Sequence, residues 1–86
     1  MYYVYVLQNP KNGVLYYGFS TDLKGRLKRH QEMEHPGWAL VYYEAYRDER
    51  DARTRERMLK HYGSSRGKLK ARLQHSLRVE DLERAG

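Results

Sequence analysis

Two short apolar runs separated by an Asn-Gly pair constrain this chain more than any other feature of its sequence. The runs cover Tyr2–Leu7 and Val14–Phe19, and both are rich in the β-branched and aromatic side chains that favour strands. Between them, Asn12-Gly13 favours the positive φ angles of a tight turn. The pattern therefore predicts a hairpin. Because both faces of the first run are apolar or aromatic, we expect its strand to be the central one.

The rest of the chain predicts helices around one further strand. Ser20-Thr21-Asp22 provides helix-capping groups, and a helix should run from there to about Met33. The later elements are a strand over Leu40–Tyr46, a helix from the N-cap Asp48 to a left-handed stop at Gly63, and a helix over Arg66–Leu77 carrying Leu69, Leu73 and Leu77. The order β-β-α-β-α-α predicts an α+β fold with a small three-stranded antiparallel sheet flanked by helices. We expect one domain over residues 1–77 and a polar tail over 78–86.

Charge and size limit the classes of partner. The chain has 86 residues and a formal net charge of +6, which suits a polyanion such as nucleic acid. It has no cysteine, which excludes disulfides, thiolate zinc sites and a cysteine nucleophile. No apolar stretch is long enough to span a bilayer, and no leader pattern is visible, so we expect a cytoplasmic protein without a membrane partner.

Glu56 is the first candidate for chemistry. It lies between Ala52 and Leu59 on the expected buried stripe of the second long helix, where an unpaired charge is costly. A partly buried salt bridge with a neighbouring arginine is the structural explanation, and a bound cation is the functional one. Arg26 and His30 lie four residues apart on one helix face, which suits phosphate binding and proton transfer but is also typical of a solvated surface.

In combination, these residues resemble the GIY-YIG nuclease superfamily, particularly its small stand-alone members related to the N-terminal nuclease domain of an excinuclease. Tyr3-Val4-Tyr5 is similar to the Gly-Ile-Tyr motif, and Tyr16-Tyr17-Gly18 is similar to the Tyr-Ile-Gly motif. The resemblance continues through the helix with the catalytic arginine, the third strand and the metal-site helix, which here are Thr21–His30, Leu40–Glu44 and Ala52–Lys60.

The resemblance implies a metal-dependent DNA endonuclease that hydrolyses phosphodiester bonds. It implies that Tyr5 and Tyr16 are active-site tyrosines, Arg26 the phosphate-binding cation and His30 a proton or hydrogen-bond partner. Glu56 would be the ligand of a single Mg²⁺, with Mn²⁺ as a possible substitute, and Gly18 would permit close backbone approach. Which tyrosine is the general base stays open. Further contacts to nucleic acid are expected from basic side chains on the helices, namely Lys24, Lys28, Arg29, Lys60, Arg66 and Lys68.

The sequence also departs from the family pattern. Tyr3 replaces the first glycine, Tyr17 replaces an aliphatic residue, and Phe19 stands where some members have a lysine. The segment between His30 and Trp38 is shorter than in close relatives, which removes a polar loop that would otherwise be available to substrate. Substrate range is therefore the least constrained property.

Two alternatives to an enzyme remain at this point. One is a non-catalytic nucleic-acid-binding module on the same fold. The other is a domain that stacks RNA bases on its tyrosines. Branched, damaged or single-stranded DNA are all candidate substrates, and RNA is not excluded. A single active site cuts one strand, so double-strand cleavage requires dimerisation or sequential nicking, and the oligomeric state is open.

Overall fold

The structure is a computed structural model and describes residues 1–77. The expected polar tail over residues 78–86 lies outside the described residues. The elements are strands β1 (Tyr2–Gln8), β2 (Leu15–Ser20) and β3 (Ala39–Tyr46), helices α1 (Leu23–Arg29), α2 (Glu49–His61) and α3 (Gly63–Arg72), and a π-helical turn η1 (His30–Glu34) that directly continues α1.

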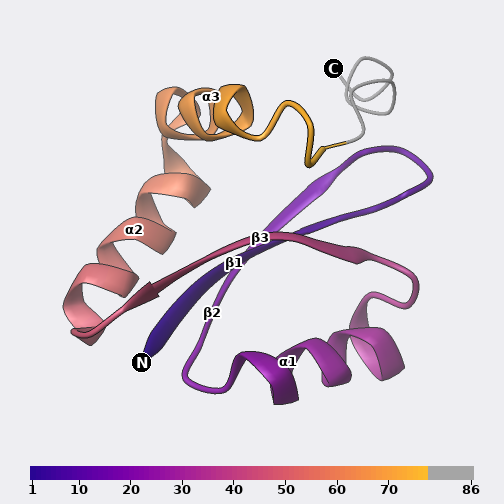
Figure 1. The fold of residues 1–86 in the computed structure, drawn as a ribbon, viewed down its shortest axis with the longest axis horizontal. Helices are drawn as coiled ribbons and strands as arrows, with labels where there is room; N and C mark the ends of the chain where they lie inside the picture. Colours follow the sequence, from indigo (N-terminus) through magenta and orange to yellow (C-terminus); the bar gives the residue numbers. More distant parts are fainter. Residues whose placement is uncertain (78–86) are drawn as a thin grey trace.

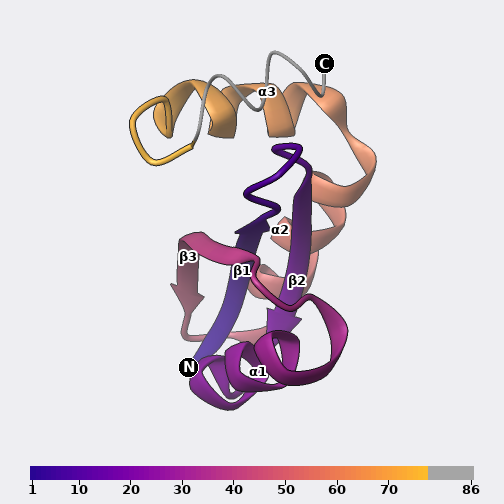
Figure 2. The same ribbon diagram turned by 90° about the vertical axis from the view of Figure 1, so that its right-hand side faces the viewer.

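The strands form one antiparallel sheet in the order β2-β1-β3, with β1 in the centre as predicted. The α+β fold and the order β-β-α-β-α-α are confirmed, with η1 as an extension of the first helix. Figures 1 and 2 show α1 at one end of the sheet and α3 at the opposite end, with α2 alongside. α2 packs against all three strands.

The turn between β1 and β2 differs from the predicted form. Gly13 has a φ of +75°, whereas no non-glycine residue among the described ones has a positive φ. Asn12 therefore does not adopt the left-handed conformation, and its Oδ1 instead accepts a hydrogen bond from the Val14 amide at 3.0 Å. The connection is consequently wider than a two-residue turn, and a backbone hydrogen bond from Asn9 to Val14 closes it at 2.9 Å.

The two faces of β1 are buried by different partners. Val4 and Val6 belong to the main apolar core, together with side chains from α2 and the C-terminal region. Tyr5 and Leu7, which alternate with them, are also buried, at 1% exposure each. The main core is completed by Tyr17, Ala52, Leu59, Leu69, Leu73 and Leu77.

The first helix begins as the sequence predicts and ends differently. The side chain of Asp22 accepts a hydrogen bond from the Gly25 amide at 3.1 Å. A Cβ on residue 25 would lie 2.3 Å from the Asp22 carboxylate, so Gly25 leaves the space that this cap needs. The predicted helix to Met33 is present, but its last turn is the π-helical η1, in which the His35 amide donates to the His30 carbonyl at 2.7 Å.

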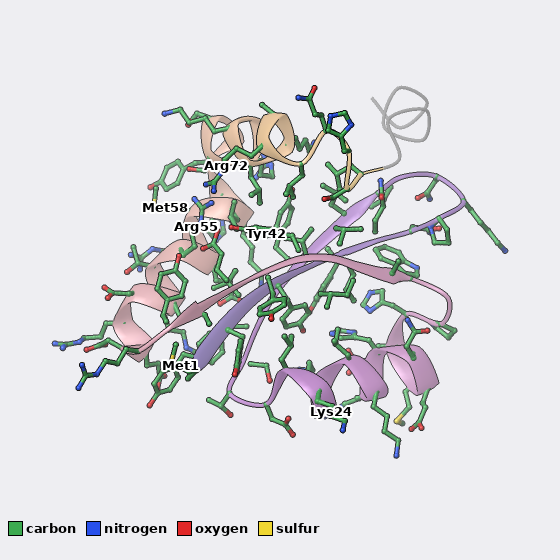
Figure 3. All side chains as sticks on the ribbon, viewed as in Figure 1. Met1, Lys24, Tyr42, Arg55, Met58 and Arg72 are labelled. Atoms are coloured by element: carbon green, nitrogen blue, oxygen red, sulfur yellow. The ribbon has the colours of Figure 1, made fainter. Side chains whose placement is uncertain are left out.

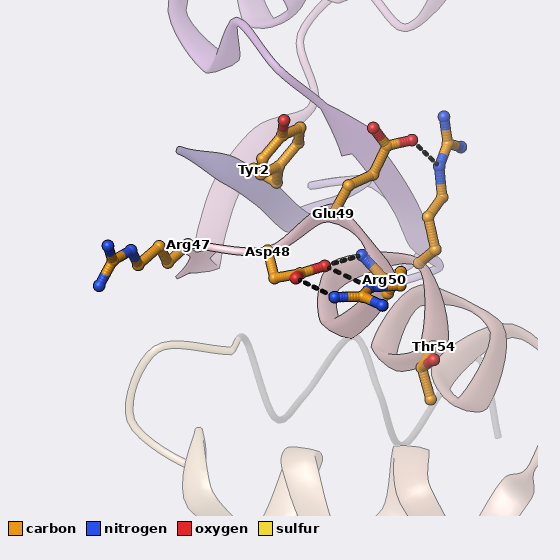
Figure 4. Close-up of a pocket in the computed structure, with 7 residues that line it drawn as sticks. Tyr2, Arg47, Asp48, Glu49, Arg50 and Thr54 are labelled. Atoms are coloured by element: carbon orange, nitrogen blue, oxygen red, sulfur yellow. Dashed lines mark hydrogen bonds and ion pairs between the residues drawn. The ribbon is translucent and has the colours of Figure 1, made fainter.

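The second helix confirms its predicted N-cap. Asp48 Oδ1 accepts from the Arg50 amide at 2.8 Å, and its carboxylate also pairs with the Arg50 guanidinium, as Figure 4 shows. The predicted left-handed stop at Gly63 is wrong, because Gly63 does not have a positive φ and instead begins α3. The helix end is satisfied in another way, by Arg66, whose Nη1 donates to the carbonyl oxygens of Leu59 and Lys60 at 3.0 Å each.

The predicted boundaries of the third helix are also wrong. α3 starts at Gly63 and ends at Arg72, so Leu73 and Leu77 lie beyond it. Both leucines are nevertheless buried in the main core, as their apolar spacing led us to expect. The backbone turns after Arg72 through hydrogen bonds from Ser76 and Leu77 to the Leu73 carbonyl.

A polar cluster joins β3 to α2. Tyr42 and Tyr46 donate to the Glu44 carboxylate, and Arg55 pairs with it at 3.1 Å. Figure 3 shows Tyr42 and Arg55 near one another between β3 and α2. Burial raises the pKa of Glu44, but these hydrogen bonds outweigh burial and leave the pKa below its ordinary value.

Within residues 1–77, every helix is too short or too polar to cross a lipid bilayer.

Candidate active site

A polar cleft of about 470 Å³ runs past the free edge of β2, between α1 and α2. It brings together Tyr5, Tyr16, Arg26 and Glu56 from β1, β2, α1 and α2. The sequence-predicted side chains are thus assembled from four different elements. The remaining lining residues are Phe19, Ser20, Thr21, Arg53 and Lys60.

Tyr5 reaches this cleft by lying over Gly18. The two residues are directly opposite in the β1–β2 ladder. A Cβ on residue 18 would lie 2.4 Å from both Cζ and the hydroxyl oxygen of Tyr5, closer than any real contact. The absence of a side chain on residue 18 therefore lets the Tyr5 ring cross β2. The resemblance implied a close approach of the Gly18 backbone, and in the structure the atoms nearest to that position belong to the Tyr5 ring.

The Tyr5 hydroxyl is hydrogen-bonded to His30 Nε2 at 2.7 Å. Both side chains are 1% exposed. Burial raises the pKa of the Tyr5 hydroxyl, and the nearby Tyr16 raises it further, while Arg26 lowers it. Burial also lowers the pKa of His30, although the Glu34 carboxylate acts in the opposite direction. Burial therefore favours the uncharged forms of both side chains, and a neutral His30 can accept the Tyr5 hydrogen bond at Nε2.

His30 has further partners on its other side. Its Nδ1 lies 2.9 Å from His35 Nδ1 and 3.2 Å from Glu34 Oε2. The Tyr16 ring packs against both imidazoles, with centroid distances of 5.2 Å to His30 and 4.8 Å to His35. The Trp38 ring in turn lies 4.7 Å from His35. The segment after His30 therefore forms an aromatic wall behind Tyr5 and Tyr16.

Glu56 is on the cleft side of α2 and only 16% of its side chain is exposed. It forms the expected partly buried salt bridge, but the partner is Lys60, at 3.1 Å, and not an arginine. A single carboxylate at an open polar cleft also has the chemistry that Mg²⁺ needs, because Mg²⁺ keeps several of its waters and prefers oxygen ligands. Lys60 is 44% exposed, which leaves its flexible side chain free to move off the carboxylate. The residues present fit a hard divalent cation.

The basic side chains predicted to bind nucleic acid are distributed unevenly. Lys60 lines the cleft, whereas Lys24 is exposed on α1 and borders a different hollow, as its outward position in Figure 3 illustrates. Arg29 is paired with Glu34 at 2.9 Å and Lys28 with Glu32 at 4.0 Å. The last pair, Arg66 and Lys68, lies on α3 at the far end of the molecule from α1 (Figures 1 and 2).

Sequence reasoning did not identify Arg53, Glu34 or His35. Arg53 lines the cleft, with its guanidinium carbon 3.7 Å from the centre of the Phe19 ring. Helical spacing offered a signal for Arg53, since it precedes Glu56 by three residues and therefore shares its face. Helical spacing also offered a signal for Glu34, which follows His30 by four residues, whereas His35 had none because its position depends on the π-helical turn.

Comparisons with known proteins agree with this geometry. The family model described as the GIY-YIG catalytic domain matches residues 1–70, which is most of the chain. No curated protein and no solved structure gave a match. GIY-YIG domains have a nuclease-type fold, depend on metal ions in general and act on nucleic acid. With the matched region covering both tyrosine motifs, Arg26, His30 and Glu56, the chain belongs to the GIY-YIG nuclease superfamily.

Proposed function

We propose that this protein is a Mg²⁺-dependent DNA endonuclease that hydrolyses one phosphodiester bond at a time in the cleft beside β2. The observation that carries the proposal is the convergence of Tyr5, Tyr16, Arg26 and Glu56 on one cleft, with His30 hydrogen-bonded directly behind Tyr5. These groups supply a base, a cation and a metal-binding carboxylate, which is the minimum set for cutting a phosphodiester.

Tyr5 and His30 together explain how a tyrosine acts as a base at neutral pH. A free phenol has a pKa near 10, so only about 0.1% is ionised at pH 7. Burial makes the Tyr5 phenolate scarcer still. The hydrogen bond at 2.7 Å removes this difficulty, because Tyr5 gives its proton to His30 Nε2 as it takes one from the attacking water. This arrangement favours Tyr5 over Tyr16 as the base.

The cations of the cleft have distinct tasks. Arg26 lies on the α1 side, where its guanidinium binds the scissile phosphate and offsets charge that grows on the phosphoryl oxygens. Arg53 and Lys60 lie on the α2 side and position the neighbouring phosphates. When bound at Glu56, Mg²⁺ supplies Lewis-acid stabilisation of the leaving 3′ oxygen.

DNA is the proposed substrate because the chain is basic and its cleft is open and polar. A protein of net charge +6 gains affinity from counterion release along a phosphate backbone.

The decisive experiment incubates the full chain with labelled single-stranded, nicked, flapped, branched and duplex DNA and with a matched RNA. Cleavage should require Mg²⁺ or Mn²⁺ and stop when a chelator is added. Glu56→Gln should lose cleavage and keep its fold, because Gln preserves the size of the side chain but not its charge. Met58→Gln, on the exposed side of the same helix, is the matched control and should cut normally.

A non-catalytic nucleic-acid-binding module is the alternative, and the Glu56–Lys60 ion pair is the observation that favours it. In that case, binding would need no metal and Glu56→Gln would bind DNA as well as or better than the parent. Absence of cleavage on every substrate, with metal-independent binding intact, would establish this alternative.

A further inference from the structure

Metal-ligating side chains from η1 and the residue after it converge behind the active-site tyrosines. His30, Glu34 and His35 each offer a ligand atom, and these atoms all lie within 4.8 Å of one another. We propose that these side chains bind a transition-metal cation of the Zn²⁺ type, at a site separate from the Mg²⁺-binding carboxylate Glu56. The proposal is independent of the nuclease reaction, because it depends only on binding.

Two of the three separations between the donor atoms are close to those of tetrahedral coordination. Zn–N and Zn–O bonds of about 2.0–2.1 Å in a tetrahedron place neighbouring ligand atoms about 3.3 Å apart. His30 Nδ1 lies 3.2 Å from Glu34 Oε2 and 2.9 Å from His35 Nδ1. The third separation, between the ligand atoms of Glu34 and His35, is within 4.8 Å, so these two side chains would draw together around the cation when it binds. Two imidazoles and one carboxylate leave a fourth position for water, as in many zinc sites with three protein ligands.

The donors are already oriented by a second set of contacts. The other ring nitrogen of His30 is bonded to the Tyr5 hydroxyl at 2.7 Å, and the other oxygen of Glu34 accepts from Arg29 Nε at 2.9 Å. Metal-binding histidines and carboxylates are commonly held in this way, which fixes the ring nitrogen that faces the cation. The His35 ring is held between Tyr16 and Trp38.

The π-helical turn is what brings the donors together. In an α-helix, residues five apart point about 140° away from each other around the axis, so His30 and His35 would diverge. Here the His35 amide donates to the His30 carbonyl at 2.7 Å, and the two ring centroids are 5.0 Å apart. π-helical turns are rare and frequent at functional sites. This one aligns His35 with a helical i, i+4 pair, His30 and Glu34.

The alternative to a metal site is a hydrogen-bonded cluster, in which one imidazole nitrogen donates a proton to the other. Cation selectivity distinguishes the metal site from the hydrogen-bonded cluster. Imidazole ligands favour Zn²⁺ and Co²⁺, whereas Mg²⁺ prefers oxygen ligands and retains its waters. A proton-sharing cluster binds neither Zn²⁺ nor Co²⁺ tightly, while a metal site binds both and ignores Mg²⁺.

The test is a Co²⁺ titration of the full chain, prepared without an affinity tag and treated with chelator. The wild type should bind one equivalent and develop the intense visible absorption of four-coordinate Co²⁺. Zn²⁺ should abolish the band, and Mg²⁺ in large excess should leave it unchanged. His35→Ala and Glu34→Gln should each weaken Co²⁺ binding by about tenfold or more. His61→Ala removes an exposed histidine on α2 and should bind as the wild type does.

Several outcomes would overturn the proposal. They are the lack of a Co²⁺ band in the wild type, a band that Mg²⁺ displaces, and a band that persists at full strength in both His35→Ala and Glu34→Gln. His35 and Glu34 are not part of the main core, so circular dichroism should show that both variants are folded. If His35→Ala nevertheless unfolds, Co²⁺ binding by Glu34→Gln alone tests whether these side chains form the site. Glu56→Gln should keep Co²⁺ binding even where it abolishes cleavage, which separates this site from the proposed function.

Discussion

The Tyr5 ring occupies the space that a side chain at residue 18 would need, with Cζ and the hydroxyl oxygen 2.4 Å from an ideal Cβ there. Tyr5 is buried and hydrogen-bonded to His30, so its ring has little freedom to move aside. Gly18→Ala should therefore displace the base, lower the free energy of unfolding by about 1–3 kcal/mol and slow cleavage about a hundredfold.

Gly67→Ala is the matched control for that substitution. Gly67 lies in α3 with open space around its Cβ position, so alanine there should leave cleavage unchanged and stabilise the helix slightly. Urea unfolding compares the stability of the two variants, and single-turnover assays compare their cleavage rates. Normal cleavage by Gly18→Ala would show that the position of the Tyr5 ring does not limit the reaction.

Tyr5→Phe and Tyr16→Phe should separate the roles of the tyrosines. Tyr5→Phe removes the base and leaves the buried His30 Nε2 without its partner, so cleavage should fall by about 10²–10⁴-fold and stability by about 1–3 kcal/mol. Tyr16→Phe keeps the ring that packs on both imidazoles and should have the smaller effect on rate. Single-turnover rates at saturating DNA measure the difference, and the reverse ranking would assign the base to Tyr16.

Arg26 should matter more for turnover than for binding. Removing one group that stabilises transition-state charge costs about 10²–10³-fold in rate, so Arg26→Ala should lose that much at saturating DNA. Lys28→Ala, an exposed cation on the same helix, should weaken DNA binding slightly and leave turnover normal. If Arg26→Ala instead cut at the normal rate once DNA was saturating, and only needed more DNA to reach saturation, Arg26 would contribute to binding alone.

Glu44 should make stability depend on acid pH. Its pKa is below the ordinary value in the folded state, so its contribution is complete above the unfolded pKa and is lost as pH falls through the folded pKa. Burial and the Glu44 bond raise the pKa of Tyr42 and Tyr46 to about 12, so both stay protonated donors throughout this range, and Arg55 stays charged.

Urea unfolding from pH 7 to pH 3 tests this contribution. The stability difference between the wild type and Glu44→Gln should be largest near neutral pH and should shrink below about pH 4.5. A difference that stays constant across that range would mean that ionisation of Glu44 does not stabilise the fold.

Zn²⁺ should inhibit cleavage if both proposals hold. A cation on His30 Nδ1 forces the proton onto Nε2, and His30 then no longer accepts the proton of Tyr5. Zn²⁺ added to the Mg²⁺-supported reaction should therefore slow the wild type, whereas His35→Ala should require about tenfold more Zn²⁺ for the same inhibition. Equal sensitivity of the two proteins would place the inhibitory Zn²⁺ elsewhere, for example at Glu56.

Local sequence signals predicted much of this fold, and tertiary contacts determined the rest. Asp48 capped α2 as predicted because a carboxylate cap acts within its own turn. Gly63 failed as a stop because Arg66, brought back by α3, satisfies the carbonyl groups at the end of α2. The π-helical turn was not predicted, since its hydrogen bond and the packing of His35 on Tyr16 depend on the assembled sheet.

The same distinction applies to the site. Sequence alone singled out the tyrosine motifs, Arg26 and Glu56, because the order and spacing of these residues along the chain match a family pattern. The cleft itself depends on the open edge of β2 and on the Tyr5 ring crossing Gly18, which no spacing along a single segment encodes.

The central position of β1 also governs the order in which the chain can fold during synthesis. Of the three strands β1 is made before β2 and β3, and its hairpin with β2 forms from neighbouring residues. Its other edge stays unpaired until β3 has been made, and the core around Val4 and Val6 stays incomplete until Leu69 and Leu77 arrive from the C-terminal region. An unpaired, apolar strand is a template for association with other chains. The nascent protein is therefore most exposed to aggregation just before Leu69 and Leu77 are made.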